Sequence, residues 1–195
     1  MSSGMGCPAV AIAVEELRTA GVHTIIRVGT TGAIGPGPRL GDAIIAHAAL
    51  RSEGTSSSYI EPTYPAVADF DVVDALRRAA VRADHPHHVG LVESSDAYYS
   101  GSWLGEHAVR ERMELLRRAG VLSIEMEAAA LFVVGRLRGV RTGCILALRE
   151  EWREDGSRVQ AGPEFEKGLD RVIDTAVEAV RLLIQAPAIS SKPAK

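Results

Sequence analysis

The alternation of two kinds of segment constrains this chain more than any other feature of its sequence. Five segments have the length and the β-branched content of buried strands: residues 22–29, 43–52, 88–95, 121–124 and 141–148. In five others, apolar residues recur at the spacing of a helix: residues 8–20, 69–83, 108–119, 127–138 and 163–185. Such alternation predicts an α/β fold. We therefore expect a three-layer sandwich in which helices flank a central mixed, largely parallel sheet.

Length and composition are those of one globular domain. The 195 residues, 46% of them hydrophobic, suffice for a domain over residues 1–185, with residues 186–195 as a flexible polar tail. The formal net charge of −3, with no dense lysine or arginine block, gives no support to a nucleic-acid or membrane-surface partner. No uncharged apolar run reaches the ~18 residues of a membrane span. Cys7 and Cys144 form no CxxC motif, so we expect two reduced, buried thiols and a cytoplasmic protein.

The segment RVGTTGAIG, residues 27–35, is the first candidate for a binding site. It follows the strand at 22–29 and begins a loop expected over residues 30–42. Ligands of open α/β sheets lie beyond the carboxyl ends of the strands, and hydroxyls, free backbone N–H groups and one guanidinium suit a phosphate. An ordinary glycine turn is an equally supported alternative. The segment matches neither GxGxxG nor GxxxxGK, the standard nucleotide-binding loops.

The segment IEMEAAALF, residues 124–132, places two glutamates at the end of a strand and the start of a helix. The dipole at the N-terminus of that helix favours an ionised Glu127, and an ionised carboxylate accepts from two neighbouring sugar hydroxyls at once. Taken alone, Glu127 is better explained as a charge that caps the helix.

The segment SSDAYYSGSW, residues 94–103, lies largely in a loop expected over residues 96–107. Tyr98 or Tyr99 could stack there on a flat base. Packing in the core or in an interface is the commoner role of such tyrosines, and by itself it is favoured here.

Taken together, these segments are far more specific than each is alone. GMGCPAVAIAVEEL (4–17), RVGTTGAIG (27–35), PAVADFD (65–71), SSDAYY (94–99) and IEMEAAALF (124–132) follow one another in that order. The series closely resembles the nucleoside phosphorylase family of the uridine phosphorylase and hexameric purine nucleoside phosphorylase type, over nearly all of residues 2–185. The resemblance implies a pentosyltransferase that cleaves a nucleoside with phosphate, giving a free base and a pentose 1-phosphate.

The resemblance also implies where the substrates bind. The matching positions are Arg27 and Thr30 for phosphate, Thr30, Glu125, Met126 and Glu127 for the ribose, and Thr31, Gly32, Tyr98, Ile124 and Arg149 for the base. The implied catalytic residues are Arg27, Thr30 and Glu127. Inorganic phosphate is then a co-substrate, and no cofactor is expected. The implied partners are the nucleoside, phosphate and further copies of the chain, in a dimer or a trimer of dimers.

The chain departs from the family at its start. Members of the family normally begin with additional strands that carry a second phosphate-binding arginine, and Met1 falls where those strands have already ended. We therefore expect an N-terminally shortened fold in which one side of the strand at 22–29 is uncovered. Residues 1–195 by themselves are accordingly expected to be a poor enzyme and poorly soluble.

The chain also departs from the family in base recognition. Ser102 and Leu104 replace the Gln and Arg with which uridine phosphorylases bind uracil. Arg149 resembles the uridine enzymes more than the purine enzymes, which favours uridine or a related pyrimidine nucleoside. Glu150 or Glu151 could contact a purine ring, although a solvated charge cluster is the favoured interpretation.

Several alternatives stay open at this point. One is a purine nucleoside or methylthioadenosine phosphorylase, a second is a nucleoside hydrolase of the same fold, and a third is an inactive truncated relative that acts only as a subunit. The histidines at 85, 87 and 88 are interpreted as a solvated turn, because no acidic or cysteine ligand stands beside them at zinc spacing. No metal is assigned.

Overall fold

The computed structural model describes residues 1–99, 105–152 and 157–185, and the expected tail at 186–195 lies outside them. The strands are β1 (Thr24–Ala33), β2 (Ala43–Ser52), β3 (Ala66–Val67), β4 (His87–Ser95), β5 (Val121–Glu125), β6 (Arg141–Trp152) and β7 (Arg158–Gln160). The helices are α1 (Cys7–Thr19), α2 (Phe70–Arg82), α4 (Glu106–Arg118), α5 (Ala128–Leu137) and α6 (Pro163–Gln185), with a 3₁₀ turn η1 (Ser56–Ser58). Each of the five helices and five strands expected from the sequence corresponds to one of these elements.

The strands form one mixed sheet in the order β3-β2-β4-β5-β1-β6-β7. Its two longest pairings, β1 with β6 and β2 with β4, are parallel. β2 also pairs with β6 in the antiparallel sense, from Ala43 to Ala46, which joins five strands into a closed ring. The α/β sandwich with a mixed sheet is confirmed, and the ring closure is a feature that the sequence pattern did not predict.

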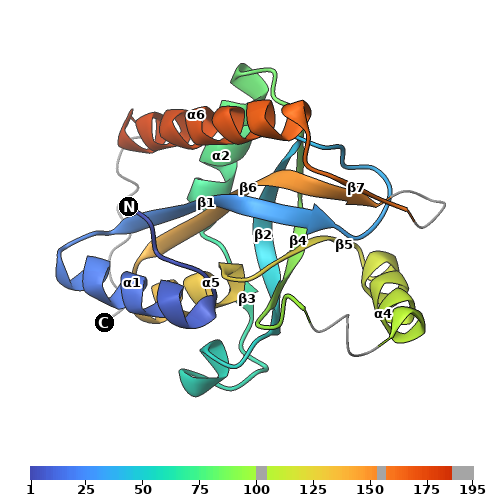
Figure 1. The fold of residues 1–195 in the computed structure, drawn as a ribbon. Coiled ribbons are helices and arrows are strands. Elements are labelled where there is room, and N and C mark those ends of the chain that lie inside the picture. Colours follow the sequence, from blue (N-terminus) through green and yellow to red (C-terminus); the bar gives the residue numbers. More distant parts are fainter. Residues whose placement is uncertain (100–104, 153–156, 186–195) are drawn as a thin grey trace.

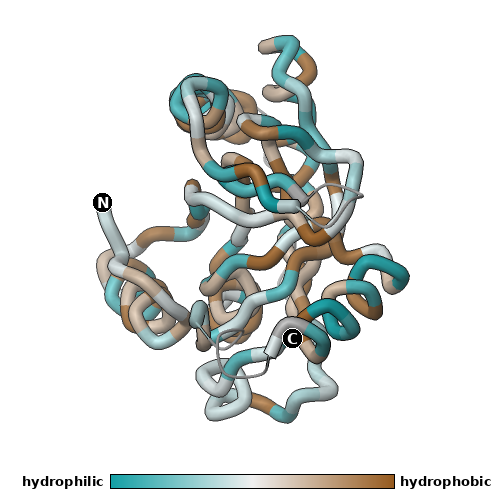
Figure 2. The backbone as a smooth tube through the Cα atoms, turned by 45° about the vertical axis from the view of Figure 1, so that its right-hand side comes forward, coloured by the Kyte–Doolittle hydropathy of each residue, from teal (hydrophilic) through white to brown (hydrophobic). Residues whose placement is uncertain are grey.

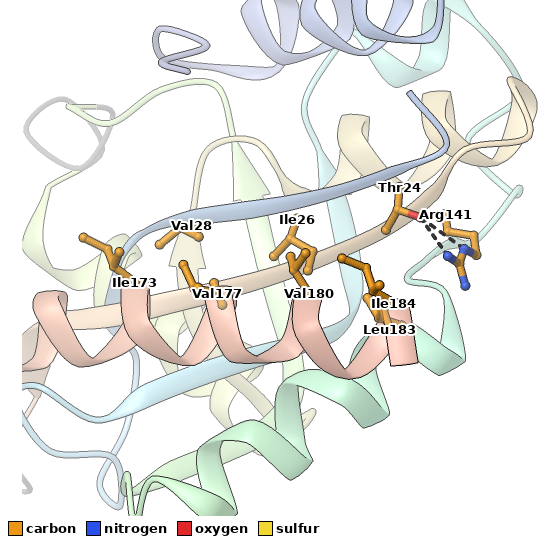
Figure 3. Close-up of a pocket in the computed structure, with 10 residues that line it drawn as sticks. Thr24, Ile26, Val28, Arg141, Ile173, Val177, Val180, Leu183 and Ile184 are labelled. Atoms are coloured by element: carbon orange, nitrogen blue, oxygen red, sulfur yellow. Dashed lines mark hydrogen bonds between the residues drawn. The ribbon is translucent and has the colours of Figure 1, made fainter. Parts of the chain in front are cut away.

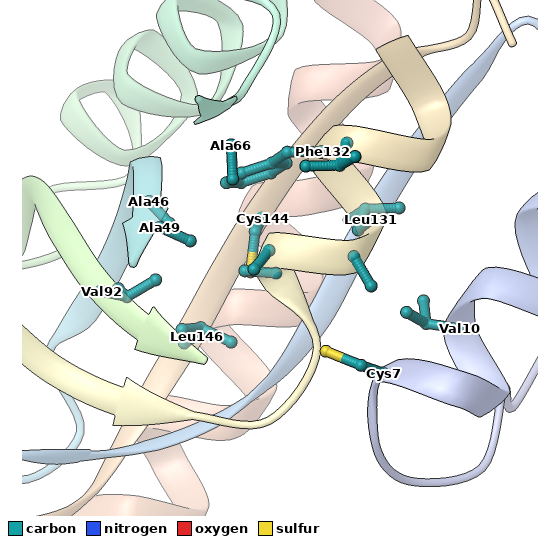
Figure 4. Packing of buried hydrophobic residues seen from close by; sticks show 14 of the residues in the cluster. Cys7, Val10, Ala46, Ala49, Ala66, Val92, Leu131, Phe132, Cys144 and Leu146 are labelled. Atoms are coloured by element: carbon teal, nitrogen blue, oxygen red, sulfur yellow. The ribbon is translucent and has the colours of Figure 1, made fainter. Parts of the chain in front are cut away.

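Helices cover both faces of the sheet, with α2 and α6 on one side and α1 and α5 on the other (Figure 1). α5 is buried on every side from Ala128 to Gly135, which explains why it is apolar all round. Its Phe132 packs among Ala66, Leu131 and Cys144 in the larger core (Figure 4). Among the described helices, none combines the length and the apolar run that a membrane crossing requires.

α4 lies at the margin of the sheet, and only a narrow stripe of it is apolar. Leu116 packs against Ile34 and Val121 in a small separate cluster. The rest of the helix is mostly hydrophilic (Figure 2). α4 therefore contributes to neither of the two main cores.

β1 is covered unevenly. It pairs with β6 from Thr24 to Gly32, whereas on its other edge the described residues pair only at Gly32 and Ala33, with β5. Toward α6, Ile26 and Val28 line an apolar groove of about 500 Å³ together with Ile173, Val177 and Val180 (Figure 3). The strand that carries the predicted phosphate site thus has a partly open edge.

The loop expected over residues 30–42 begins later than predicted. β1 continues through Ala33, so Thr30, Thr31 and Gly32 belong to a strand and not to a nest of free backbone N–H groups. The physical reason is the paired partner: β6 also runs beyond its expected end, to Trp152, and carries the polar end of β1 in its ladder.

The turn that carries three histidines was expected to be solvated, and His85 departs from this expectation. His85 is buried, with Nδ1 3.3 Å from Thr175 Oγ1 and Nε2 3.2 Å from the Gly41 carbonyl oxygen. His88 Nε2 lies 2.9 Å from Asp42 Oδ2. The solvated interpretation is wrong for His85, because α6 covers the turn and supplies Thr175.

We predict that His85 makes the fold sensitive to acid. Burial lowers the pKa of His85 from its ordinary value of 6.5, although the Gly41 carbonyl acts in the opposite direction. Below about pH 6.5 the unfolded chain binds a proton that the folded chain does not, so the free energy of unfolding falls as the pH falls. His85→Gln, which cannot titrate, should flatten this loss in urea unfolding between pH 7 and pH 5.

His107→Gln is the control, because His107 is exposed on α4. The free energy of unfolding of this variant should depend on pH as that of the wild type does. If His85→Gln and the wild type lose stability equally over this range, the assignment to His85 is wrong.

Candidate active site

Arg27 and Glu127 form a buried ion pair between β1 and the start of α5. Arg27 Nη2 donates to Glu127 Oε2, and it lies 3.7 Å from Glu125 Oε2. The Arg27 side chain is 16% exposed and that of Glu127 is 8% exposed, so solvent screens the pair little. Gly29 makes the arrangement possible, because a Cβ at that position would collide with the Arg27 guanidinium.

Glu127 occupies the N-cap position of α5, but its side chain does not cap the helix. Instead Oε1 accepts a hydrogen bond from the Gly6 backbone N–H at 2.6 Å, while Oε2 faces Arg27. Capping alone therefore does not account for this carboxylate. Gly6 holds it from the chain segment that precedes α1, a role that the sequence pattern did not assign to any residue.

Glu125 performs the capping that was considered for Glu127. Its oxygens accept from the backbone N–H of Glu127 at 2.9 Å and from that of Ala128 at 2.9 and 3.0 Å. Ser94 Oγ donates to Glu125 Oε1 and accepts from the Ala129 N–H at 2.8 Å. Burial raises the pKa of the Glu125 carboxyl, while Arg27 and these donors act in the opposite direction. Ser94 and Glu125 thus fix the backbone that carries Met126 and Glu127.

The expected base-binding residues gather at the far end of β1. Gly32 pairs with Ile124 of β5 on one side and with Glu150 of β6 on the other. Thr31 Oγ1 donates to the Ile124 carbonyl at 2.7 Å, which ties β1 to the strand that leads into Glu125. Tyr98 is 61% exposed, and its hydroxyl lies 3.3 Å from Glu150 Oε1.

Other predicted residues are not joined to this group. Thr30 is half-buried on β1, and within the described part of the chain its hydroxyl has no hydrogen bond. Arg149 is exposed on β6, one residue before Glu150. Ser102 and Leu104 lie outside the described residues. The roles of Thr30 and Arg149 therefore stay predictions.

Among the described residues, one group of potential metal ligands lies near the site. Ligand atoms of Cys7, Glu53 and Asp96 lie within 4.8 Å of one another. Glu53 already accepts from the Ser56 backbone N–H at 2.9 Å, and Cys7 Sγ donates to the Met126 carbonyl at 3.3 Å. Burial raises the pKa of the Cys7 thiol, which keeps it protonated and a weak ligand. We assign no metal to this group.

Comparison with known proteins relates this geometry to one family. A family model described as the phosphorylase superfamily matches residues 1–185. The uridine phosphorylase of Thermococcus kodakarensis is 44% identical over 153 residues, which are 75% of this chain and 55% of that protein. The guanosine phosphorylase of Halorubrum lacusprofundi is 38% identical over 189 residues, 95% of this chain and 73% of that protein.

A solved structure shows the same fold. The uridine phosphorylase of Vibrio fischeri, crystallised with 6-hydroxy-1-naphthoic acid, superposes with a TM-score of 0.79 at 31% sequence identity. The match covers 93% of this chain and 72% of that protein. The chain thus spans between about half and three quarters of the length of these relatives.

We predict that Ser94→Ala destabilises the start of α5. The substitution removes the acceptor of the buried Ala129 N–H and the hydroxyl donor of Glu125, which should lower the free energy of unfolding by about 1–3 kcal/mol. Ser95→Ala is the matched control, because Ser95 is only half-buried and receives a single weak bond of 3.4 Å from the Ala97 N–H. Urea unfolding that shows equal losses for both variants would contradict the role given to Ser94.

Proposed function

The chain belongs to the phosphorylase superfamily, and from this premise we propose that it cleaves the N-glycosidic bond of a nucleoside with inorganic phosphate. The products are a free base and a pentose 1-phosphate. A uridine phosphorylase and a guanosine phosphorylase are both among the relatives, and we propose uridine or a related pyrimidine nucleoside as the first substrate to test. The observation that carries the proposal is the buried Arg27 guanidinium held beside Glu127.

Arg27 is the proposed phosphate ligand. A guanidinium presents five N–H donors in a fixed plane. In Arg27, Nη2 faces Glu127 and Glu125, and Nη1 donates to the weak acceptor Cys144 Sγ at 3.9 Å. The remaining donors suit the oxygens of a phosphate dianion. The Thr30 hydroxyl, on the same strand and without a hydrogen bond to any described residue, is the second proposed contact, to phosphate and ribose. A cation held in a poorly hydrated site binds an anion more strongly than it binds water, which favours phosphorolysis over the hydrolase alternative.

Glu127 is the proposed ribose ligand. Its Oε1 is held by Gly6 and its Oε2 by Arg27, and each carboxylate oxygen retains a lone pair for a sugar hydroxyl. In the proposed complex a sugar on Glu127 lies beside a phosphate on Arg27, which positions the nucleophile next to the anomeric carbon. As the C–N bond breaks, the positive charge on the sugar ring is stabilised by the phosphate and by the Glu127 carboxylate. Positioning and electrostatics supply the rate acceleration in this account.

We propose for this chain the co-substrate and the assembly that the family implies. Phosphate is a co-substrate, and the proposed chemistry calls for no cofactor. The active form is proposed to be a homo-oligomer, a dimer or a trimer of dimers, in the cytoplasm.

We predict that Arg27→Ala removes most phosphate-dependent cleavage. Losing a hydrogen bond to a charged group costs about 1.5–3 kcal/mol, so phosphate affinity should fall roughly tenfold or more. Initial rates measured against phosphate concentration will show this as a raised KM for phosphate. Arg77→Ala is the control, since Arg77 pairs with Asp74 on the exposed side of α2.

An Arg27→Ala variant that keeps the phosphate dependence of the wild type would overturn the phosphate assignment. Release of base at equal rates with and without phosphate would instead support the hydrolase alternative. Absence of turnover in the wild type, at high protein concentration, would support the inactive-subunit alternative.

We predict that Glu127→Gln weakens recognition of the sugar. An amide offers one acceptor oxygen where the carboxylate offers two, so ribonucleosides should lose more activity than 2′-deoxyribonucleosides. The ratio of kcat/KM for uridine to that for 2′-deoxyuridine measures this preference. Glu16→Gln, on the exposed side of α1, should leave the ratio unchanged. Equal losses for both substrates in Glu127→Gln would show that Glu127 does not bind the diol.

A further inference from the structure

A β-bulge near the end of β6 brings Glu150 to the base-binding end of the site. Thr31 pairs with Leu148, but the next residue, Gly32, pairs with Glu150, so Arg149 is an extra residue on β6. Bulges of this kind re-aim side chains and are frequent beside active sites. In a regular register without the bulge, Arg149 would stand opposite Gly32, and Glu150 would lie one position farther along the strand.

The Glu150 carboxylate is held at both oxygens. The Tyr98 hydroxyl lies 3.3 Å from Oε1, and Arg158 Nη1 of β7 lies 3.8 Å from Oε2. The Glu150 side chain is 15% exposed, so it is neither a solvated surface charge nor sealed in the core. These two neighbours orient the carboxylate, and lone pairs remain for a further donor.

The absence of a side chain at Gly32 leaves space beside this carboxylate. A Cβ at Gly32 would lie 3.7 Å from Glu150 Oε2. On the other side of Gly32 stands Ile124, three residues before Glu127. A flat ring placed over Gly32 would therefore extend from the sugar subsite toward Glu150, with the exposed ring of Tyr98 beside it.

From this placement we propose that Glu150 is a specificity-determining residue that contacts the edge of the base, with Arg158 as its partner. The carboxylate accepts a hydrogen bond from a ring N–H, and the guanidinium donates to the neighbouring carbonyl oxygen. This pair of groups fits bases that carry an N–H next to a carbonyl: uracil, hypoxanthine and guanine. The inference rests on the proposed function, because it places the base where that function requires it.

The same pair disfavours adenine and cytosine. Each carries an unprotonated ring nitrogen beside an amino group, so the carboxylate would face a lone pair and the guanidinium would face an N–H donor. Two acceptors or two donors that face each other leave their hydrogen bonds unmade, which specific pockets use to reject substrates. The expected preference for inosine over adenosine, and for uridine over cytidine, is at least about tenfold to a hundredfold. This expectation also counts against the methylthioadenosine alternative.

The test compares Glu150→Gln with the wild type. The full chain is assayed with phosphate and each of the four nucleosides inosine, adenosine, uridine and cytidine. A glutamine amide turns to donate as readily as it accepts, so it should reduce each oxo-to-amino ratio of kcat/KM by about tenfold or more. Glu151→Gln is the matched control, because Glu151 accepts from the Leu40 N–H at 3.3 Å and lies 3.8 Å from Arg39 Nη1.

A second readout does not depend on turnover. Calorimetric titration of the wild type should show that hypoxanthine binds and that adenine binds much more weakly. In Glu150→Gln the difference in affinity between the two bases should be smaller. Unchanged ratios in both measurements overturn the role of Glu150 even if nucleosides are cleaved. Discrimination between free bases without any phosphate-dependent cleavage would support Glu150 as the reader of the base and overturn the proposed function instead.

Discussion

The buried pairing of Arg27 with Glu127 and Glu125 is the interaction on which the site depends. A guanidinium inside a protein needs acceptors, because removing one partner of a buried ion pair leaves a charge that nothing compensates. The requirement ties β1 to the start of α5, two parts of the chain separated by 100 residues. Ser94 of β4 extends the connection through Glu125. The middle of β1 and the ends of β4 and β5 are thereby held in one place by charge and hydrogen bonds.

The segment from Ile124 to Glu127 connects the two ends of the site. Ile124 pairs with Gly32 at the proposed base end, and Glu127 pairs with Arg27 at the proposed phosphate and sugar end. Glu125 fixes the backbone between them by accepting from the first N–H groups of α5. In the proposed complex, the base of a nucleoside therefore lies near Ile124 and its sugar lies near Glu127, at the two ends of four consecutive residues.

The sequence predicted the local elements well because strands and helices have different apolar periods. It also placed Arg27, Gly32 and Glu127 in candidate sites, through segments whose order resembles a known family. It did not separate the roles of the two glutamates: Glu125 caps α5, and Glu127 faces Arg27. Period and composition give no information on which carboxylate turns toward the helix, since that depends on Ser94 and Gly6 from distant parts of the chain.

Other features depended on pairings that no local pattern encodes. The continuation of β1 through Thr30, Thr31 and Gly32 requires β6 alongside, and the closure of the ring requires β2 to pair with β6. The bulge that brings Glu150 beside Gly32 appears only in the register of two strands more than 100 residues apart. His85 was assigned to solvent because the arrival of α6 over its turn is likewise a long-range contact.

In the proposed reaction phosphate, and not water, attacks the sugar. The most direct measurement follows the cleavage of uridine or inosine at high concentration of the full chain, with ¹H nuclear magnetic resonance for the base and the pentose and ³¹P resonance for the phosphate ester. We expect base release only in the presence of phosphate, with one pentose 1-phosphate formed for each base released. Base released without phosphate, accompanied by free pentose and no phosphate ester, would contradict the proposed reaction.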